Sequence, residues 1–481
     1  MLKILLFIFP LVFVGKTLEV KPEIVKKNAK GTIVNAKNGE DWFNLAPNGQ
    51  GSSEGVSVDL AYKDFGPAKN EIIVAVIDSG VDINHEDLKG KIWMNKKEIP
   101  NNGIDDDKNG YIDDFYGWNF LGSKKGMGKV LKDGSFKKGL AEYQANEEPL
   151  EVAREIGRLN RLSRNLNAAE KKYKKQLVEY MEKSAGSCRR TAWYCDTEFM
   201  SPVRKLINQE KDHHLTSNYG NNDVIGPDSS HGTHVAGIIA ANRRNNFGVD
   251  GVASNVKIMA IRAVPDGDEY DEDVANSIIY AVDNGAKVIN MSFGKSFSPK
   301  KKIVNVAVKY ARKKGVLLVH AAGNSSMENN LKNNFPNKYV GSKYLASNWI
   351  EVGASTISTK FTDGFSPQKG LAAYFSNYSK KYVDVFAPGY GINSTTPGNK
   401  YDAFSGTSMA SPVVAGCAAY ILGHYPMLKP SEVKAVLGES TRKYPNASVI
   451  KPTPAKFSSL SREGGIVDLH ESLKILKMLV D

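Results

Sequence analysis

Cysteine is scarce in this chain, with three residues among 481. None lies near residue 20, which argues against a lipid anchor of the bacterial lipoprotein type. Cys188 and Cys195 flank the turn of a predicted helical segment, and in an exported protein we expect them to form a disulfide. Cys417 falls on the apolar face of another predicted helix, so it is expected to be a buried and unreactive thiol.

Long hydrophobic runs are absent after the first fifteen residues, so no later stretch is expected to cross a membrane. Lys3 precedes an apolar run over residues 4–15 that is too short to span a bilayer comfortably. This pattern predicts a secretory signal peptide over residues 1–18, although an uncleaved anchor stays open because the cleavage site is poor. We therefore expect export, to the periplasm or the medium, and no membrane span once the signal is removed.

A concentrated block of basic charge is also absent. Lys and Arg together number 64 against 52 Asp and Glu, which gives a formal net charge of +12. The lysines are spread along the chain, and few aromatic residues lie among them. Nucleic-acid sites cluster their basic residues on one surface. We therefore expect a solvated basic surface and no nucleic-acid partner.

What is present is a serine at the predicted start of a helix made largely of small residues. Gly406 gives the backbone conformational freedom just before Ser408. Pro412 lacks an N–H, which costs little in the first turn of a helix. Free backbone N–H groups and the positive end of the helix dipole favour negative charge beside Ser408. The sequence therefore predicts a site for an oxyanion next to this hydroxyl.

Three other segments carry groups that could work with this serine. An apolar run over residues 71–78 reads as a buried parallel strand that ends at Asp78, and His231 opens a helix rich in small residues. A second apolar strand, over residues 316–321, leads to Asn324. Strand ends and helix starts meet at one edge of a parallel sheet. A serine nucleophile needs a base and a group that orients the base.

The four segments resemble the subtilisin-like serine peptidases. They read VIDSG, HGTHVAG, AAGN and GTSMASP in chain order, and the resemblance extends over roughly residues 63–437 with one interruption. The order Asp, His, Ser is that of subtilisin and differs from those of chymotrypsin and the α/β-hydrolases.

The resemblance implies a secreted serine endopeptidase that hydrolyses protein or peptide substrates through an acyl-enzyme and uses no catalytic metal. His231 would take the proton of Ser408, Asp78 would orient the imidazole, and Asn324 with the Ser408 N–H would bind the oxyanion. The rival interpretation is a catalytically silent peptide-binding protein on the same scaffold. Such proteins usually lack a catalytic side chain, and none is missing here.

The alternation of strands and helices predicts an α/β fold with three layers, in which a mostly parallel sheet carries helices on both faces. The fold is predicted to contain a helical insertion. Apolar residues recur at spacings of three and four from Ile156 to Met181, which favours a long helix, either a surface brace or an exosite or lid for substrate. The predicted division is a signal peptide (1–18), an N-terminal extension (19–62), a catalytic domain (63–135 and 216–445), the insertion (136–215) and an irregular C-terminal tail (446–481).

The resemblance also implies a substrate groove. Tyr270 would lie on one side, and Ser292, Phe293 and Gly294 on the other, with Lys295 where many relatives have a second glycine. The peptide would add to these segments as an extra strand. Six carboxylates over positions 266–273 either favour basic residues upstream of the cleaved bond or form a charge cluster at the N-terminus of a helix.

An acidic loop over residues 102–114 resembles the first half of an EF-hand calcium loop. Its oxygen side chains are Asp105, Asp107, Asn109 and Asp113, but Tyr116 stands where the loop would need a bidentate Glu. A turn held by its own Asp and Asn side chains explains the same pattern.

Family resemblance implies a second structural calcium site, formed by Asp87 and the loop containing Asn245, although the two arginines in that loop count against it. Among the histidines not used so far, His320 sits inside an apolar strand and is expected to be a core residue.

Overall fold

The computed structural model describes residues 41–47, 53–121, 128–130, 136–138, 219–226, 228–265, 268–296, 298, 300–341, 345–358, 370–450 and 454–480. The chain divides into two compact units, residues 1–35 and 36–481, and all described residues belong to the second. The predicted signal peptide, both cysteines of the predicted disulfide and nearly all of the predicted helical insertion lie outside the described residues.

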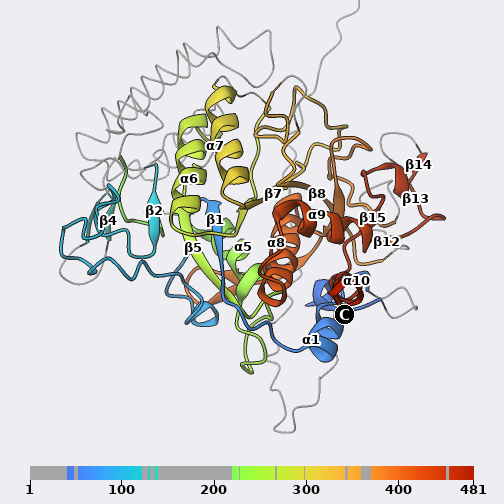
Figure 1. Ribbon diagram of the computed structural model, residues 1–481, viewed down its shortest axis with the longest axis horizontal. Coiled ribbons are helices and arrows are strands. Elements are labelled where there is room, and N and C mark those ends of the chain that lie inside the picture. The colour runs from blue at the N-terminus through green and yellow to red at the C-terminus, as the bar shows by residue number, and fades with distance from the viewer. Residues whose placement is uncertain are drawn as a thin grey trace, which may run out of the picture. The chain divides into compact units, whose positions relative to one another are not determined.

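The centre of this unit is a sheet that has nine strands in the described part of the chain (Figure 1). Its order is β12-β15-β9-β8-β7-β6-β1-β5-β2, and every pairing is parallel except that of β12 with β15. The strands are β1 (Ile72–Asp78), β2 (Gly117–Asn119), β5 (Val256–Arg262), β6 (Val288–Met291), β7 (Leu317–Ala321), β8 (Trp349–Ser355), β9 (Val385–Pro388), β12 (Arg442–Lys443) and β15 (Gly465–Ile466).

Among the described residues, three antiparallel pairs of strands lie outside this sheet. They are β3 (Gly128–Val130) with β4 (Phe136–Lys138), β10 (Ile392–Thr396) with β11 (Lys400–Phe404), and β13 (Ser448–Ile450) with β14 (Pro454–Lys456).

Helices cover both faces of the sheet because its central strands are apolar on both sides. Val74 and Val76 of β1 belong to one core, and Ala75 and Ile77 belong to the other. The first core contains α5 (Ser230–Ala240), α8 (Thr407–His424), α9 (Pro430–Glu439), α10 (Leu469–Val480) and α1 (Val58–Phe65); the second contains α6 (Asp271–Asp283) and α7 (Lys301–Lys313). The predicted three-layer α/β fold is therefore confirmed.

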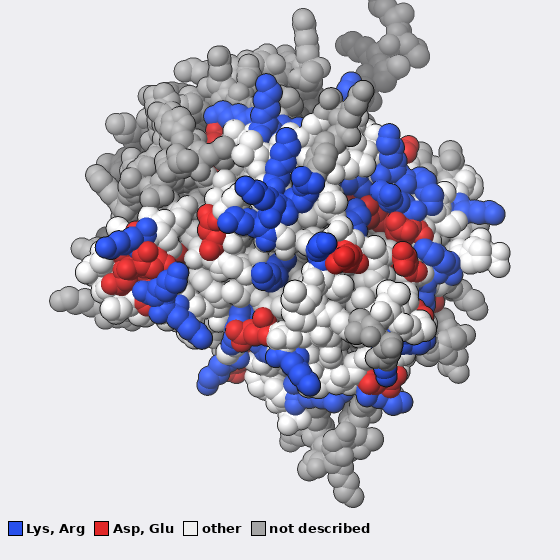
Figure 2. All heavy atoms as spheres, in the orientation of Figure 1, with Lys and Arg blue, Asp and Glu red and all other residues white. Residues whose placement is uncertain are grey.

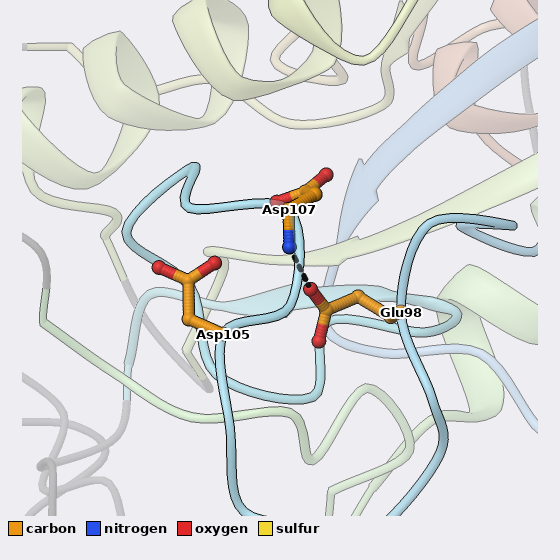
Figure 3. Close-up of side chains that lie close together, drawn as sticks. All are labelled: Glu98, Asp105 and Asp107. Carbon is orange, nitrogen blue, oxygen red and sulfur yellow. Dashed lines mark hydrogen bonds between the residues drawn. The ribbon is translucent and has the colours of Figure 1, made fainter.

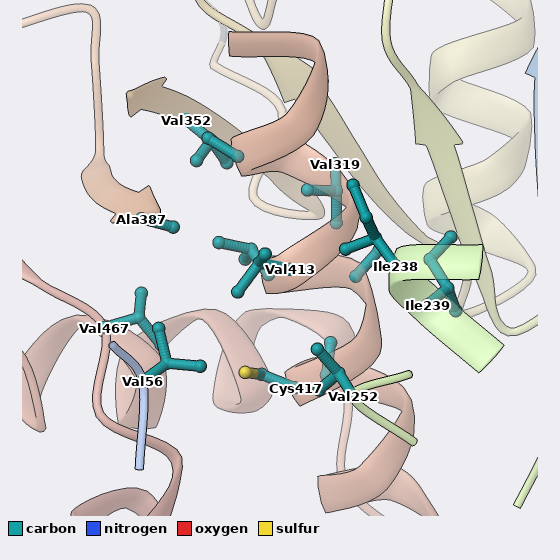
Figure 4. Packing of buried hydrophobic residues seen from close by; sticks show 14 of the residues in the cluster. Val56, Ile238, Ile239, Val252, Val319, Val352, Ala387, Val413, Cys417 and Val467 are labelled. Atoms are coloured by element: carbon teal, nitrogen blue, oxygen red, sulfur yellow. The ribbon is translucent and has the colours of Figure 1, made fainter. Parts of the chain in front are cut away.

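Helix α8 lies in the middle of the first core. Figure 4 shows Val413 of this helix among buried side chains from α5 and the sheet, and Cys417 pointing toward Val56 and Val467. A β-carbon on Gly416 would come within 2.6 Å of the Val252 side chain, so the small residue permits the close approach. Cys417 is fully buried and free, as predicted, and burial raises the pKa of its thiol.

The C-terminal end of the described chain differs from the prediction. The C-terminal tail is not irregular, because β15 joins the main sheet and Leu469, Leu473 and Leu476 bury one face of α10. Residues 41–47 and 53–62 also contribute to this core, through Trp42 among others. Extension, catalytic domain and tail therefore share one hydrophobic core.

Surface charge is distributed as the composition suggests. Figure 2 shows Lys and Arg over much of the visible face, with acidic side chains among them. The expectation that no nucleic acid binds stays a prediction. Within the described ranges, no helix combines the length and the hydrophobicity needed to cross a membrane.

Candidate active site

The carboxyl ends of three adjacent strands bring the predicted groups to one edge of the sheet. Strand β1 lies between β5 and β6, so the strands that follow it in the chain are added on one side of β1 up to β5 and on its other side from β6 onward. Open α/β sheets form a crevice at such a point. Asp78 is the last residue of β1, Ser292 follows β6, and Asn324 lies shortly after β7.

Asp78 and His231 are in direct contact. His231 is the second residue of α5, and its Nδ1 lies 2.7 Å from Asp78 Oδ1, which also accepts a hydrogen bond from Ser79 N at 2.8 Å. A β-carbon on Gly232 would overlap Gly80 O, so a glycine at this position lets α5 approach the turn after β1. Asp78 is buried, whereas 39% of the His231 side chain is exposed. The imidazole is thus fixed by Asp78 at Nδ1, while part of the ring stays accessible to solvent.

Ser408 lies in the first turn of α8, but Pro412 does not, which corrects the sequence prediction. The helix begins at Thr407, and Pro412 is its sixth residue, so the missing N–H leaves Ser408 O without its partner in the helix. Ser292 Oγ donates to this oxygen at 2.8 Å. The segment after β6 therefore compensates for the proline and holds the start of α8 in place.

The hydroxyl of Ser408 donates to Ser292 O at 3.0 Å. Among the described residues, no hydrogen bond joins it to His231, although α5 and α8 pack against each other. Catalytic hydrogen bonds are often long or absent until substrate binds. The structure therefore assembles Asp78 with His231 and places Ser408 on the neighbouring helix in a rotamer that faces the strand end.

Asn324 is oriented by Thr407, a residue that the sequence analysis did not single out. Its Oδ1 accepts hydrogen bonds from Thr407 N and Thr407 Oγ1, both at 2.9 Å, and Thr407 Oγ1 accepts from Gly323 N at 3.0 Å. With Oδ1 occupied in this way, Nδ2 is the group left to face outward. A β-carbon built on Gly406 would lie 3.5 Å from Asn324 Nδ2 and 3.6 Å from Ser408 N. Two N–H donors therefore border the same small space.

The predicted groove segments lie on either side of this edge. Tyr270 is half-buried and precedes α6, and residues 292–294 follow β6 directly. The Ser292 hydroxyl is bonded to Ser408 O and to Ser411 Oγ, at 2.8 and 2.9 Å, so it is part of the support of α8. Phe293 is half-buried and Gly294 is exposed.

Asn334 is a second residue near the site that the sequence patterns did not indicate. Its Oδ1 lies 2.7 Å from the position of a β-carbon on Gly294 and 2.9 Å from that of one on Gly323. Its Nδ2 is bonded to Ala321 O at 3.0 Å and to Glu351 Oε1 at 2.7 Å. The side chain thus fills the space between the segments after β6 and β7, where only glycines leave room for it.

The acidic segment before α6 is engaged within the protein. Asp271 and Glu272 are bonded to residues 295–300, and Asp273 accepts a hydrogen bond from Tyr219 OH at 2.5 Å. All three lie in the first turn of the helix. This arrangement favours the charge cluster at a helix N-terminus over a preference for basic substrate residues; Asp266 lies outside the described residues.

The acidic loop contains a cluster of carboxylates. Glu98, Asp105 and Asp107 each offer an oxygen within 4.8 Å of the others, and Figure 3 shows them facing a common space. Glu98 was missed because it precedes the loop motif. Asn109 is next to the cluster, its N–H bonded to Asp105 and Asp107 at 3.0 and 3.1 Å. Asp113 instead accepts hydrogen bonds from the N–H groups of residues 102 and 103, at 3.0 and 2.9 Å, and is not part of it.

The second predicted metal pair is also brought together. Asn245 Nδ2 donates to Asp87 Oδ1 at 2.6 Å, and Val249 N donates to Oδ2 at 2.9 Å. Burial raises the pKa of Asp87. Arg243 turns away from this pair and bonds to Asp59 of α1 at 2.7 Å.

His320 is a fully buried core residue, as expected. Its Nδ1 lies 3.1 Å from Glu351 Oε2.

Comparisons with known proteins agree with this architecture. Residues 69–460 match the model of the subtilase family. The chain is 43% identical over 194 residues to a thermophilic serine proteinase of Bacillus sp. (strain AK1), covering 40% of this chain and 42% of that protein. It is 28% identical over 379 residues to subtilisin-like protease 1 of Plasmodium falciparum (isolate 3D7), covering 76% and 39%.

Subtilisin E of Bacillus subtilis (strain 168) is 37% identical over 220 residues, covering 45% of this chain and 51% of the relative. The chain thus spans about half or less of the length of these curated relatives. A solved structure of a protease from Pseudoalteromonas arctica PAMC 21717 is similar in fold, with a TM-score of 0.51 and 23% identity, covering 91% of this chain and 97% of that one.

Proposed function

This chain belongs to the subtilase family, and we propose that it is a serine endopeptidase that cleaves protein or peptide substrates through an acyl-enzyme. One observation carries the proposal: the Asp78–His231 pair and the two N–H donors around Ser408 lie at the same edge of the sheet. A hydrolase of this type needs an oriented base, a nucleophile and an oxyanion site. Export is also proposed, from the pattern of residues 1–18, which lie outside the described part of the chain.

The proposed reaction begins when Ser408 Oγ leaves Ser292 O and donates to His231 Nε2. His231 takes the proton as Ser408 attacks the scissile carbonyl, and Asp78 stabilises the imidazolium through Nδ1–H. The negative charge that develops on the carbonyl oxygen is bound by Asn324 Nδ2 and Ser408 N. His231 then returns the proton to the leaving amine, and water releases the acyl group through the same steps in reverse order.

Labelling by a fluorophosphonate probe tests the proposal. The intact protein is expected to react at Ser408 and to hydrolyse an unstructured protein substrate, whereas Ser408→Ala should do neither. A correctly folded protein that neither labels nor hydrolyses would favour the rival interpretation, a silent peptide-binding protein. Mass spectrometry of the labelled peptide identifies the residue that reacts.

The pH dependence of kcat/KM is expected to show an acidic limb above pH 6.5. Burial of the ring acts to lower the pKa of His231, but the carboxylate of Asp78 outweighs it and raises this pKa above 6.5. Only neutral His231 accepts the serine proton, so activity falls as pH drops through the raised pKa. At pH 5.5 less than about a tenth of the plateau should remain. A plateau that continues to pH 5 would contradict this assignment of the base.

We propose that Glu98, Asp105 and Asp107 hold a structural calcium ion, with Asn109 beside them. The donors are oxygens, which suits a hard cation, and such an ion would neutralise carboxylates that otherwise repel one another. Asp87 and Asn245 form the second candidate pair. No step of the proposed hydrolysis passes through either site.

Calcium is expected to raise Tm by about 5 °C when its concentration is about 100 times Kd. Glu98→Gln should remove most of this increase, because one charged ligand is lost from the cluster. Asp113→Asn is the matched control, since Asp113 bonds to backbone N–H groups outside the cluster. It should lower Tm equally with and without calcium. An equal loss of the calcium effect in both variants would argue that the loop as a whole, and not these ligands, is responsible.

A further inference from the structure

The two predicted walls of the groove are linked by one buried side chain. The segment that contains Tyr270 follows β5, and residues 292–295 follow β6. The two segments therefore lie on opposite sides of β1. Lys295 belongs to the second wall. Its Nζ donates to Glu269 O and lies 3.1 Å from Asp271 Oδ1, both in the first wall. The residues on either side of Tyr270 are therefore bonded to the residue after Gly294.

Lys295 is also anchored through its backbone. Lys295 N donates to Phe335 O at 2.9 Å, and Phe335 N donates to Lys295 O at 2.7 Å. Asp271 receives two more hydrogen bonds from beyond Lys295, from Ser298 Oγ at 2.8 Å and Lys300 N at 2.7 Å. Lys295 thus joins its own segment to two others, to residues 269–271 through its ammonium group and to Phe335 through its backbone.

The charges in this contact are removed from water. The side chains of Lys295 and Asp271 are 6% and 3% exposed. Burial acts to lower the pKa of Lys295, but Glu269 and Asp271 outweigh it and the pKa is raised. An ion pair in such a setting keeps its geometry, because separating the partners leaves a buried charge without compensation. The spacing of the two walls is therefore fixed by a buried and directional contact.

We propose that Lys295 is a positioning residue that sets the width of the substrate groove on the side that binds residues upstream of the scissile bond. The inference rests on the proposed function. Lys295 is three residues beyond Ser292, which contacts Ser408, so an extended segment places it about 10 Å from the reacting serine. It can therefore affect binding of the second to fourth upstream residues without touching the atoms that react. A second glycine at this position could not link the walls.

The test compares a long and a short substrate. The long one carries four residues before the cleaved bond, and the short one is an acylated single amino acid with the same leaving group. Lys295→Met is expected to raise KM and lower kcat/KM for the long substrate at least tenfold. It should change kcat/KM for the short substrate less than twofold. Rates are normalised to the sites titrated with fluorophosphonate, so that loss of folded protein does not enter.

Three further variants separate positioning from stability. Lys295→Met/Asp271→Asn removes the unpaired buried charge and should keep the selective loss even where the single variant folds poorly. Lys295→Arg retains the cation and should recover most of the long-substrate activity. Lys338→Met is the matched control, because Lys338 is also buried, bonded to Asp384 at 3.0 Å, and is not part of either wall.

The inference would be overturned if Lys295→Met affected both substrates equally, or if Lys338→Met produced the same selective loss. Failure of the proposed function looks different, since the unmodified protein would then neither label nor cleave either substrate.

Discussion

His231→Ala is expected to lower kcat for a peptide substrate by about 10⁵- to 10⁶-fold. The reason is that, within the described part of the chain, the Ser408 hydroxyl is bonded to no other base: it donates to a carbonyl oxygen, Ser292 O, which cannot accept the proton fully. The imidazole is aligned for this task by the 2.7 Å contact with Asp78. Binding of substrate should change little, because the groove segments are on other elements. The measurement is kcat and KM on titrated enzyme.

The double variant His231→Ala/Ser408→Ala distinguishes a catalytic unit from two separate contributions. If the residues act together, the double variant should be no slower than either single variant. Additive losses would show that each residue contributes alone and would count against the proposed mechanism. Retention of kcat within tenfold in His231→Ala would remove the base from it altogether. Circular dichroism of each variant checks that the fold is retained.

Asn324→Ala is expected to lower kcat by about 10²- to 10³-fold and to leave KM nearly unchanged. Its Nδ2 and Ser408 N border one space, so both would face an oxygen that becomes negative in the transition state. The ground-state carbonyl gains less from the same donors, which is why the loss falls on kcat. A rise in KM with unchanged kcat would contradict this role and would assign Asn324 to substrate binding.

Thr407→Val tests how Asn324 is held. The variant keeps the Thr407 N–H bond to Oδ1 but loses the hydroxyl bond of the same length, 2.9 Å, and also leaves Gly323 N without its acceptor. We expect a smaller fall in kcat, about tenfold. Thr407→Ser retains the hydroxyl and serves as the control. If Val and Ser variants behaved alike, the orientation of Asn324 would have to come from other contacts.

Local patterns in the chain were sufficient for the family, the layered α/β fold and the elements that carry the four predicted catalytic groups. These inferences succeed because hydrophobic runs define strands, and small residues before and after Ser408 and His231 define helices that must approach other backbones closely. The roles of Asp78, His231, Asn324 and Ser408 stay predictions until the variants are measured.

Other features depend on contacts between distant segments and left no local signal. Pro412 lies beyond the first turn of α8 because Ser292, 120 positions earlier, supplies the hydrogen bond that the proline removes. The C-terminal tail forms a strand and a helix because β15 pairs with β9 of the main sheet and α10 packs against the first core. The sequence shows Lys295 only as a residue in place of a glycine, whereas in the structure its ammonium is buried against Glu269 O and the carboxylate of Asp271. The packing of helices and strands determines which side chains become partners in this way. The helices and strands themselves are determined by the pattern of residues along each one.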